Sequence, residues 1–241
     1  HTAYRRQRQM CIRDSVTYNG LRLIACDGSD LCIAHNPQDE TTYFQTLPDR
    51  KGYNLLHLNA FYDLCSRQYT DAIIQPSRLA NERRAMCEMI DRYNDTSAIF
   101  IADRGYENYN IFAHVEHKGM YYLIRVKDIT SNGITSKLTM LPESGEFDEW
   151  VNVTLTKKQT NEVKANPKKY RVIDKKTPFD YLDLHFNNFY EMKMRVIRFP
   201  IPQGSYECII TNLPQDKFNS DEIKRLYACL LYTSPSPRDR Q

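Results

Sequence analysis

The sequence lacks the patterns of a disulfide-bonded, zinc-binding or membrane-spanning protein. It has seven cysteines in 241 residues, but they are scattered and form no C-x-x-C pair. This spacing argues against structural zinc and a disulfide framework, and it suits a reducing compartment. No apolar run approaches the ~20 residues that a membrane-spanning helix needs, and no secretory signal is visible. These absences favour a cytoplasmic protein without a membrane partner.

Net charge also gives no sign of a DNA-binding protein. Lysine and arginine number 33 against 30 acidic residues. Both ends of the chain, residues 1–15 and 230–241, resemble translations of the adapter DNA used in sequencing libraries. They contain six arginines and two aspartates, so 27 basic and 28 acidic residues remain between them. We expect a fragment whose ends take no part in the fold, and any DNA-binding surface must be a local patch.

Two short apolar stretches each lead into an aspartate. Leu21–Cys26 precedes Asp27, and Ala98–Ala102 precedes Asp103. Each stretch has the length of a buried strand, and open α/β sheets place their chemistry at the carboxyl ends of strands. An alternative is that Asp103 caps a helix expected to begin near Asn108. Two strand-end aspartates in one domain would suit a divalent cation, because hard cations prefer oxygen ligands.

The segment 16–127 alternates between strand-like and helix-like patterns. Met86, Met89, Ile90 and Tyr93 recur at three- and four-residue steps, which is typical of an amphipathic helix that begins after Asn81. The order of elements favours an α/β domain. The expected strands are 21–26, 31–35, 41–45, 53–58, 71–75, 98–102 and 121–126, and the expected helices are 59–65, 81–93 and 108–118.

The segment 128–205 changes character and indicates a β-rich insertion. Polar and apolar residues alternate in Val151–Thr156, and strand-like runs follow at 170–173, 182–186 and 192–199. Lysines are frequent here, including Lys157 and Lys158. Such a face is usually only solvated, although it could contact phosphates. After the insertion, the segment 206–229 contains one more strand, 207–212, and the start of a helix, 218–228.

Several motifs in this order resemble one protein family. D-G-S at Asp27–Ser29 and A-D-R-G-Y-E-N-Y-N at Ala102–Asn110 are similar to the first and second acidic motifs of bacterial insertion-sequence transposases with a DDE domain, the IS-four group. The resemblance implies a ribonuclease-H-like mixed α/β sheet with helices, interrupted by a β-rich insertion. It continues through Y-L-I-R-V-K-D (122–128), L-T-K-K-Q-T (155–160), I-I-T-N-L (209–213) and E-I-K-R-L-Y (222–227).

The resemblance implies an enzyme that cuts DNA and joins its 3′-hydroxyl to new DNA. Asp27 and Asp103 would be catalytic residues and ligands of Mg²⁺ or Mn²⁺. Two such ions about 4 Å apart can activate the attacking oxygen and stabilise the leaving oxygen. The expected partners are double-stranded DNA, both transposon ends and target, and a second copy of the chain. A nucleoid-associated location in the cytoplasm follows.

The third acid of the family is absent at its expected place. It is a glutamate within the pattern Tyr-x2-Arg-x3-Glu-x6-Lys on the last helix, and Tyr227 fits the tyrosine. Glu222 lies one turn too early to replace it, and Glu207 lies on an expected strand. We therefore expect this chain to be inactive. The positions of the arginine, glutamate and lysine are occupied by Leu230, Ser234 and Gln241.

Candidates for DNA contact are weaker. Arg104 and Tyr106 follow the second aspartate and could reach DNA, although they could equally serve loop structure. Two other functions remain open. One is a metal-dependent nuclease of the same fold that does not rejoin DNA, and the other is a remnant that only binds DNA or dimerises. The full set of DNA-binding candidates is Arg104, Tyr106, Lys157, Lys158 and Tyr227.

Overall fold

The computed structural model describes residues 17–94, 97–182, 188–202 and 204–233. Most residues of the adapter-like ends lie outside these ranges, and so do most residues of the strand expected at 182–186. The ten strands of the described residues belong to one mixed sheet, in the order β2-β3-β1-β5-β6-β10-β9-β7-β8, with β4 also paired to β3. The strands are β1 (Arg22–Ile33), β2 (Tyr43–Phe44), β3 (Tyr53–Asp63), β4 (Gln68–Pro76), β5 (Ala98–Ala102), β6 (Tyr121–Val126), β7 (Phe147–Thr156), β8 (Tyr170–Val172), β9 (Tyr190–Pro200) and β10 (Tyr206–Thr211).

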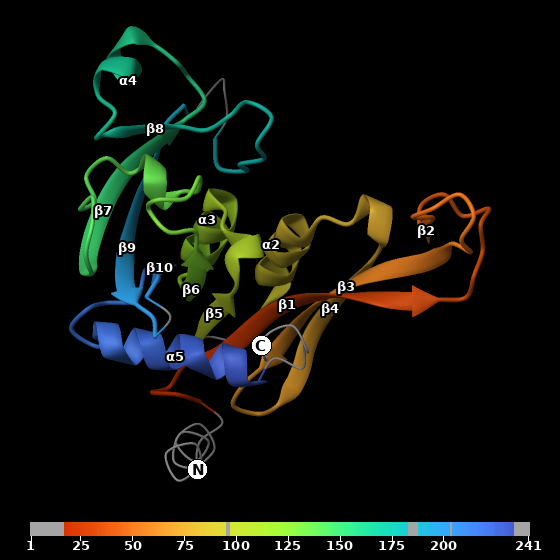
Figure 1. The fold of residues 1–241 in the computed structure, drawn as a ribbon. Coiled ribbons are helices and arrows are strands. Elements are labelled where there is room, and N and C mark those ends of the chain that lie inside the picture. The colour runs from red at the N-terminus through yellow and green to blue at the C-terminus, as the bar shows by residue number, and fades with distance from the viewer. Residues whose placement is uncertain (1–16, 95–96, 183–187, 203, 234–241) are drawn as a thin grey trace.

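Helices cover both faces of the sheet (Figure 1). The described helices are α2 (Glu82–Arg92), α3 (Tyr109–His117), α4 (Asn161–Ala165) and α5 (Ser220–Thr233). Alternate residues of a strand point to opposite faces. In β5, Phe100 packs in one core with residues of α2 and α3, whereas Ile99 packs in a second core with residues of α5. This arrangement agrees with the expected ribonuclease-H-like mixed sheet. None of the described helices is long and apolar enough to cross a membrane.

The first strands are longer than the sequence predicted. The stretches 21–26 and 31–35 belong to a single strand, β1, and the helix expected at 59–65 is wrong because β3 continues to Asp63. β3 pairs with β1 from Asn54 to Asp63 and with β4 on its other side. Ladder hydrogen bonds on both edges, with Phe61 fully buried, outweigh the helical spacing of a few apolar residues.

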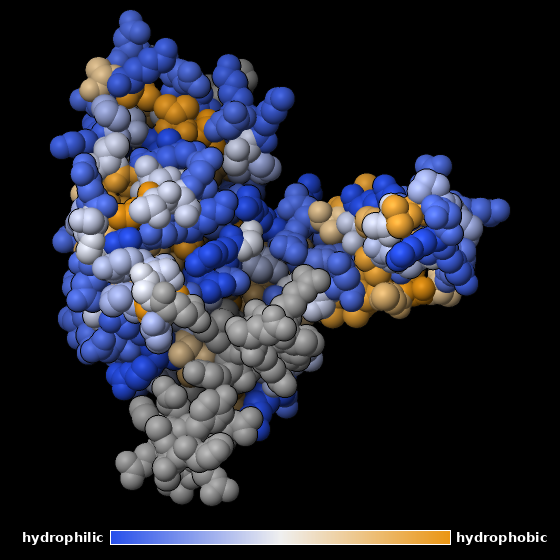
Figure 2. Space-filling model, viewed as in Figure 1, coloured by the Kyte–Doolittle hydropathy of each residue, from blue (hydrophilic) through white to orange (hydrophobic). Residues whose placement is uncertain are grey.

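These strands form an arm that projects from the body of the molecule (Figure 1). Figure 2 shows apolar surface on this arm. Among the described residues, the large hydrophobic side chains that are exposed all lie between positions 31 and 79, except Phe189. The arm therefore carries apolar groups that the two cores do not cover.

The β-rich segment extends the main sheet and does not form a separate one. β9 pairs with β10 on one side and with β7 on the other, and β8 adds to β7. The last helix also differs from expectation. We expected the start of a helix over 218–228 and a chain end from 230 that takes no part in the fold, but α5 has 14 residues and continues to Thr233.

One buried arginine joins the β-rich strands to the segment before α5. Arg195 of β9 is fully buried, and its guanidinium binds both carboxylate oxygens of Asp148 on β7, at 2.6 and 2.5 Å. It also donates to the carbonyl of Phe218 at 2.6 Å. A bidentate arrangement of this kind satisfies both charged groups inside the protein.

Replacing this arginine should destabilise the fold strongly. In Arg195→Ala, the Asp148 carboxylate keeps its largely buried position but loses its partner, which costs about 3–5 kcal/mol. Urea denaturation followed by circular dichroism measures the loss. Arg84→Ala is the matched control, because Arg84 pairs with Glu88 at the surface and its loss should leave the unfolding midpoint almost unchanged. Equal midpoints for the two variants would contradict the role of Arg195.

Candidate active site

Strand register brings Asp27 and Asp103 to neighbouring positions. The parallel pairing of β1 and β5 ends with Cys26 opposite Ala102, and each aspartate is the next residue. Paired strands lie about 4.8 Å apart, so the two side chains start from adjacent points of the sheet. Asp27 is not at the end of its strand, as the sequence suggested. β1 continues to Ile33 against β3, and Asp27 marks the point where β5 leaves β1.

Asp103 caps a short 3₁₀ helix and not α3. Its carboxylate accepts a hydrogen bond from the backbone N–H of Arg104 at 2.6 Å and caps the 3₁₀ turn Arg104–Tyr106. The side chain that caps α3 is Asn108, which accepts from the N–H of Asn110 at 2.7 Å. The alternative that Asp103 caps this helix is therefore wrong.

An arginine from the next strand holds the Asp103 carboxylate. Arg125 of β6 donates from Nε to Oδ1 at 2.5 Å and from Nη2 to Oδ2 at 2.8 Å. Its Nη1 donates to Oε1 of Glu207 on β10 at 2.8 Å. The hydroxyl of Tyr227 on α5 lies 3.5 Å from Oδ1 of Asp103. The Asp103 carboxylate, after β5, is thus contacted from β6 and α5, and β10 contributes through the bond of Glu207 to Arg125.

The two aspartates fit a divalent cation as oxygen donors. Asp27 is exposed, and the Asp103 side chain is 45% exposed, so both carboxylates can be reached from solvent. No three His, Cys, Asp or Glu side chains in the described ranges are already arranged around a common ion position. The donor set therefore suits one cation bound through Asp27 and Asp103.

The comparison with known families decides what this domain is. The family described as the transposase DDE domain matches residues 18–229. The chain belongs to this family. The expectation of a DDE transposase is therefore confirmed, while the assignment to the bacterial IS-four group stays a prediction. No curated protein matches the chain.

One solved structure similar to this DDE domain is a piggyBac transposase synaptic complex with hairpin DNA. The TM-score is 0.47 and the sequence identity is 7%. The match covers 86% of this chain but 38% of that chain, so the DDE domain described here spans well under half of that transposase.

Burial and charge act in opposite directions on Asp103 of the DDE domain. Partial burial raises the pKa of its carboxyl. The hydrogen bonds and the charge of Arg125, with a smaller contribution from Arg104, lower this pKa by more than burial raises it. The net effect is a pKa below the ordinary value for aspartate. The carboxylate is ionised at neutral pH, which is the form that a cation requires.

The other DNA-binding candidates do not all gather at this site. Arg104 is exposed beside Asp103, but Tyr106 is only 3% exposed. A ring buried in the core cannot reach DNA, so the expectation for Tyr106 is wrong and its structural alternative is correct. Lys157 and Lys158 follow β7, which three strands separate from β5. They lie on a different part of the molecule from the aspartates.

Tyr227 also differs from expectation. It is 2% exposed and packs in the core beneath α5, with its hydroxyl directed at Asp103. Because its ring does not face solvent, the expectation of DNA contact is wrong for this residue as well. Its position instead supports the pair formed by Asp103 and Arg125, whose guanidinium lies 5.6 Å from the centre of the tyrosine ring.

Sequence reasoning missed the groups that surround the aspartates. Arg125 had a signal, since it is the single charged residue of an otherwise apolar strand, Y-Y-L-I-R-V. Glu207 was rejected as a substitute for the third acid because it lies on a strand, and the structure places it on Arg125.

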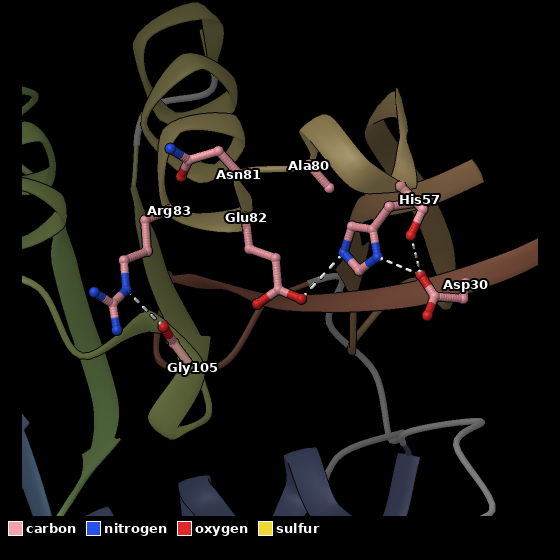
Figure 3. A pocket seen from close by; sticks show the side chains of 8 residues that line it. Asp30, His57, Ala80, Asn81, Glu82, Arg83 and Gly105 are labelled. Carbon is pink, nitrogen blue, oxygen red and sulfur yellow. Dashed lines mark hydrogen bonds and ion pairs between the residues drawn. The ribbon is translucent and has the colours of Figure 1, made fainter. Parts of the chain in front are cut away.

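A polar cavity of about 520 Å³ has Gly105, two residues after Asp103, in its wall (Figure 3). Its walls come from β1, β3, the start of α2 and the turn after Asp103. Figure 3 shows the imidazole of His57 between the carboxylates of Asp30 and Glu82. The lining residues are Asp30, His57, Ser77, Ala80, Asn81, Glu82, Arg83 and Gly105.

Replacing Arg125 by glutamine should raise the pKa of Asp103. Burial of the carboxyl raises this pKa, and without the guanidinium less positive charge remains to lower it. A carboxyl whose folded-state pKa is lowered contributes stability above its unfolded-state pKa, and that stability is lost as the pH falls through the folded-state value. In Arg125→Gln this loss should therefore begin at higher pH.

An NMR titration of the Asp103 carboxyl carbon measures this change. Arg104→Gln is the matched control, because the charge of Arg104 contributes less and its loss should shift the pKa less. An unchanged Asp103 pKa in Arg125→Gln would show that the guanidinium does not control this carboxylate.

Proposed function

We propose that the full transposase to which this domain belongs cleaves DNA at transposon ends and joins the freed 3′-hydroxyl to target DNA. The observation that supports this proposal is the pair Asp27 and Asp103. In this DDE domain they lie side by side, directly after the paired part of β1 and β5. The partners are double-stranded DNA and a second copy of the chain. The reaction takes place in the cytoplasm, at the nucleoid.

Each residue of the site has a distinct task. Asp27 and Asp103 would hold Mg²⁺ or Mn²⁺, which when bound supplies Lewis-acid activation of the scissile phosphate. Asp27 is exposed, so its carboxylate can be reached by a cation from solvent. Arg125 keeps Asp103 ionised and fixes its orientation. Arg104 stands exposed beside Asp103, where a cationic side chain can bind a DNA phosphate.

The β-rich strands offer a second place for DNA. Lys157 and Lys158 follow β7 and can neutralise phosphates away from the reacting bond. Contacts of this kind set the position of a duplex and carry no sequence information. The proposal therefore assigns them to holding DNA and not to the choice of transposon end.

This particular chain should not cut DNA. Where the family pattern has an arginine, a glutamate and a lysine on the last helix, it has Leu230, Ser234 and Gln241. Ser234 and Gln241 lie outside the described residues. Without the glutamate, a second ion lacks its protein ligand, and stabilisation of both the attacking and leaving oxygens is lost.

Restoring the last helix should restore cleavage. The test replaces the residues after Ala228 with the corresponding stretch of a full-length relative and assays Mg²⁺-dependent cutting of that relative's transposon-end DNA. We expect cleavage by the repaired chain and none by the original. Metal stabilisation is worth several kcal/mol, so Asp103→Ala in the repaired chain should reduce the rate at least about 100-fold.

The matched control in the repaired chain is Asp49→Asn, since Asp49 is an exposed carboxylate in the arm. It should cut like the repaired parent. Cleavage by the original chain would contradict the expectation that it is inactive. A repaired Asp103→Ala variant that cuts as fast as the repaired parent would contradict the assignment of the site.

A further inference from the structure

A third carboxylate lies against the backbone on both sides of the proposed site. Glu82 is the first residue of α2. A Cβ atom placed on Gly28, next to Asp27, would lie 3.0 Å from its Oε1, and one placed on Gly105 would lie 3.3 Å from its Oε2. The carboxylate therefore fits between Gly28 of β1 and Gly105 of the 3₁₀ turn after Asp103, and the absence of a side chain at Gly28 makes its close approach possible.

A buried histidine lies next to this carboxylate. His57 of β3 is 9% exposed, and its Nδ1 lies 2.8 Å from Oδ1 of Asp30. Its Nε2 lies 3.1 Å from Oε1 of Glu82, an ion-pair distance, yet has no well-directed hydrogen bond among the described residues (Figure 3). An imidazole fixed by one carboxylate and facing a second is a recurrent way to orient a metal ligand.

A purely structural role for Glu82 explains less. An acidic residue in the first turn stabilises a helix through its dipole, and Glu82 satisfies that rule. The rule does not account for a carboxylate set between two glycines, Gly28 and Gly105, with a histidine and an aspartate next to it. Its side chain is 40% exposed, so it can be reached from solvent.

We propose that Glu82 is a third carboxylate of the cation site formed by Asp27 and Asp103, with His57 and Asp30 as positioning residues. This inference rests on the proposed function. In the present arrangement the three carboxylates do not yet surround one position, and Glu82 is paired with His57. A cation bound by the two aspartates gives Glu82 a stronger partner than the imidazole.

Manganese binding to the full chain tests this proposal without any DNA cleavage. Isothermal titration with Mn²⁺ is performed on the parent chain and on the variants Glu82→Gln, Asp27→Asn and Asp103→Asn. Glu88→Gln is the matched control, since Glu88 lies on the same helix and pairs with Arg84 at the surface. Urea midpoints and circular dichroism confirm that each variant is folded.

We expect both aspartate variants to lose Mn²⁺ binding, Glu82→Gln to weaken it about 10- to 100-fold, and Glu88→Gln to leave it unchanged. Parent-like affinity in Glu82→Gln, together with loss in the aspartate variants, would overturn the inference and leave the proposed site intact. Parent-like affinity in the aspartate variants, or no binding by the parent, would overturn the site itself and the inference with it.

The role of His57 is tested by a double-mutant cycle. If His57 acts by positioning Glu82, His57→Gln weakens Mn²⁺ binding in the parent chain but has little further effect in Glu82→Gln. A histidine that only supports the fold would weaken binding equally in both backgrounds, and that result would remove His57 from the proposal.

Discussion

The site depends on the five-residue parallel pairing of β1 with β5. This pairing fixes Cys26 opposite Ala102, and so places Asp27 beside Asp103. Strand register is set by the burial of alternate residues, because a shift by one would turn each apolar side chain to the wrong face. Since β5 is buried along its whole length between α2, α3 and α5, its register is strongly determined.

Charge balance then shapes the site around this pairing. Asp103 and Glu207 are two carboxylates that face one guanidinium, that of Arg125. A partly buried carboxylate without a partner would have a raised pKa, and it would bind a proton and lose its charge more readily. Arg125 therefore stabilises the charge of Asp103, and Glu207 gives the arginine a second carboxylate partner.

The sequence predicted the elements whose signals are local. The Met86 and Met89 stripe gave the helix α2, and the apolar run ending before Asp103 gave β5. It did not predict that β3 continues through Phe61, because pairing on both edges is a property of distant segments. For the same reason it separated the β-rich strands from the main sheet, although β9 pairs directly with β10.

The position of Glu82 follows from that same misjudged strand. His57 can face α2 only because β3 runs straight beside β1, where Asp30 lies opposite His57 in the ladder. Had residues 59–65 formed a helix, β3 would have stopped soon after His57, and the ladder that holds this ring between Asp30 and Glu82 would have been cut short. The long arm and the third carboxylate are thus linked, since the strand that builds the arm also carries the histidine that meets Glu82. A change in the arm near His57 would therefore be felt beside Asp27 and Asp103, because packed strands and helices transmit small displacements rather than absorb them.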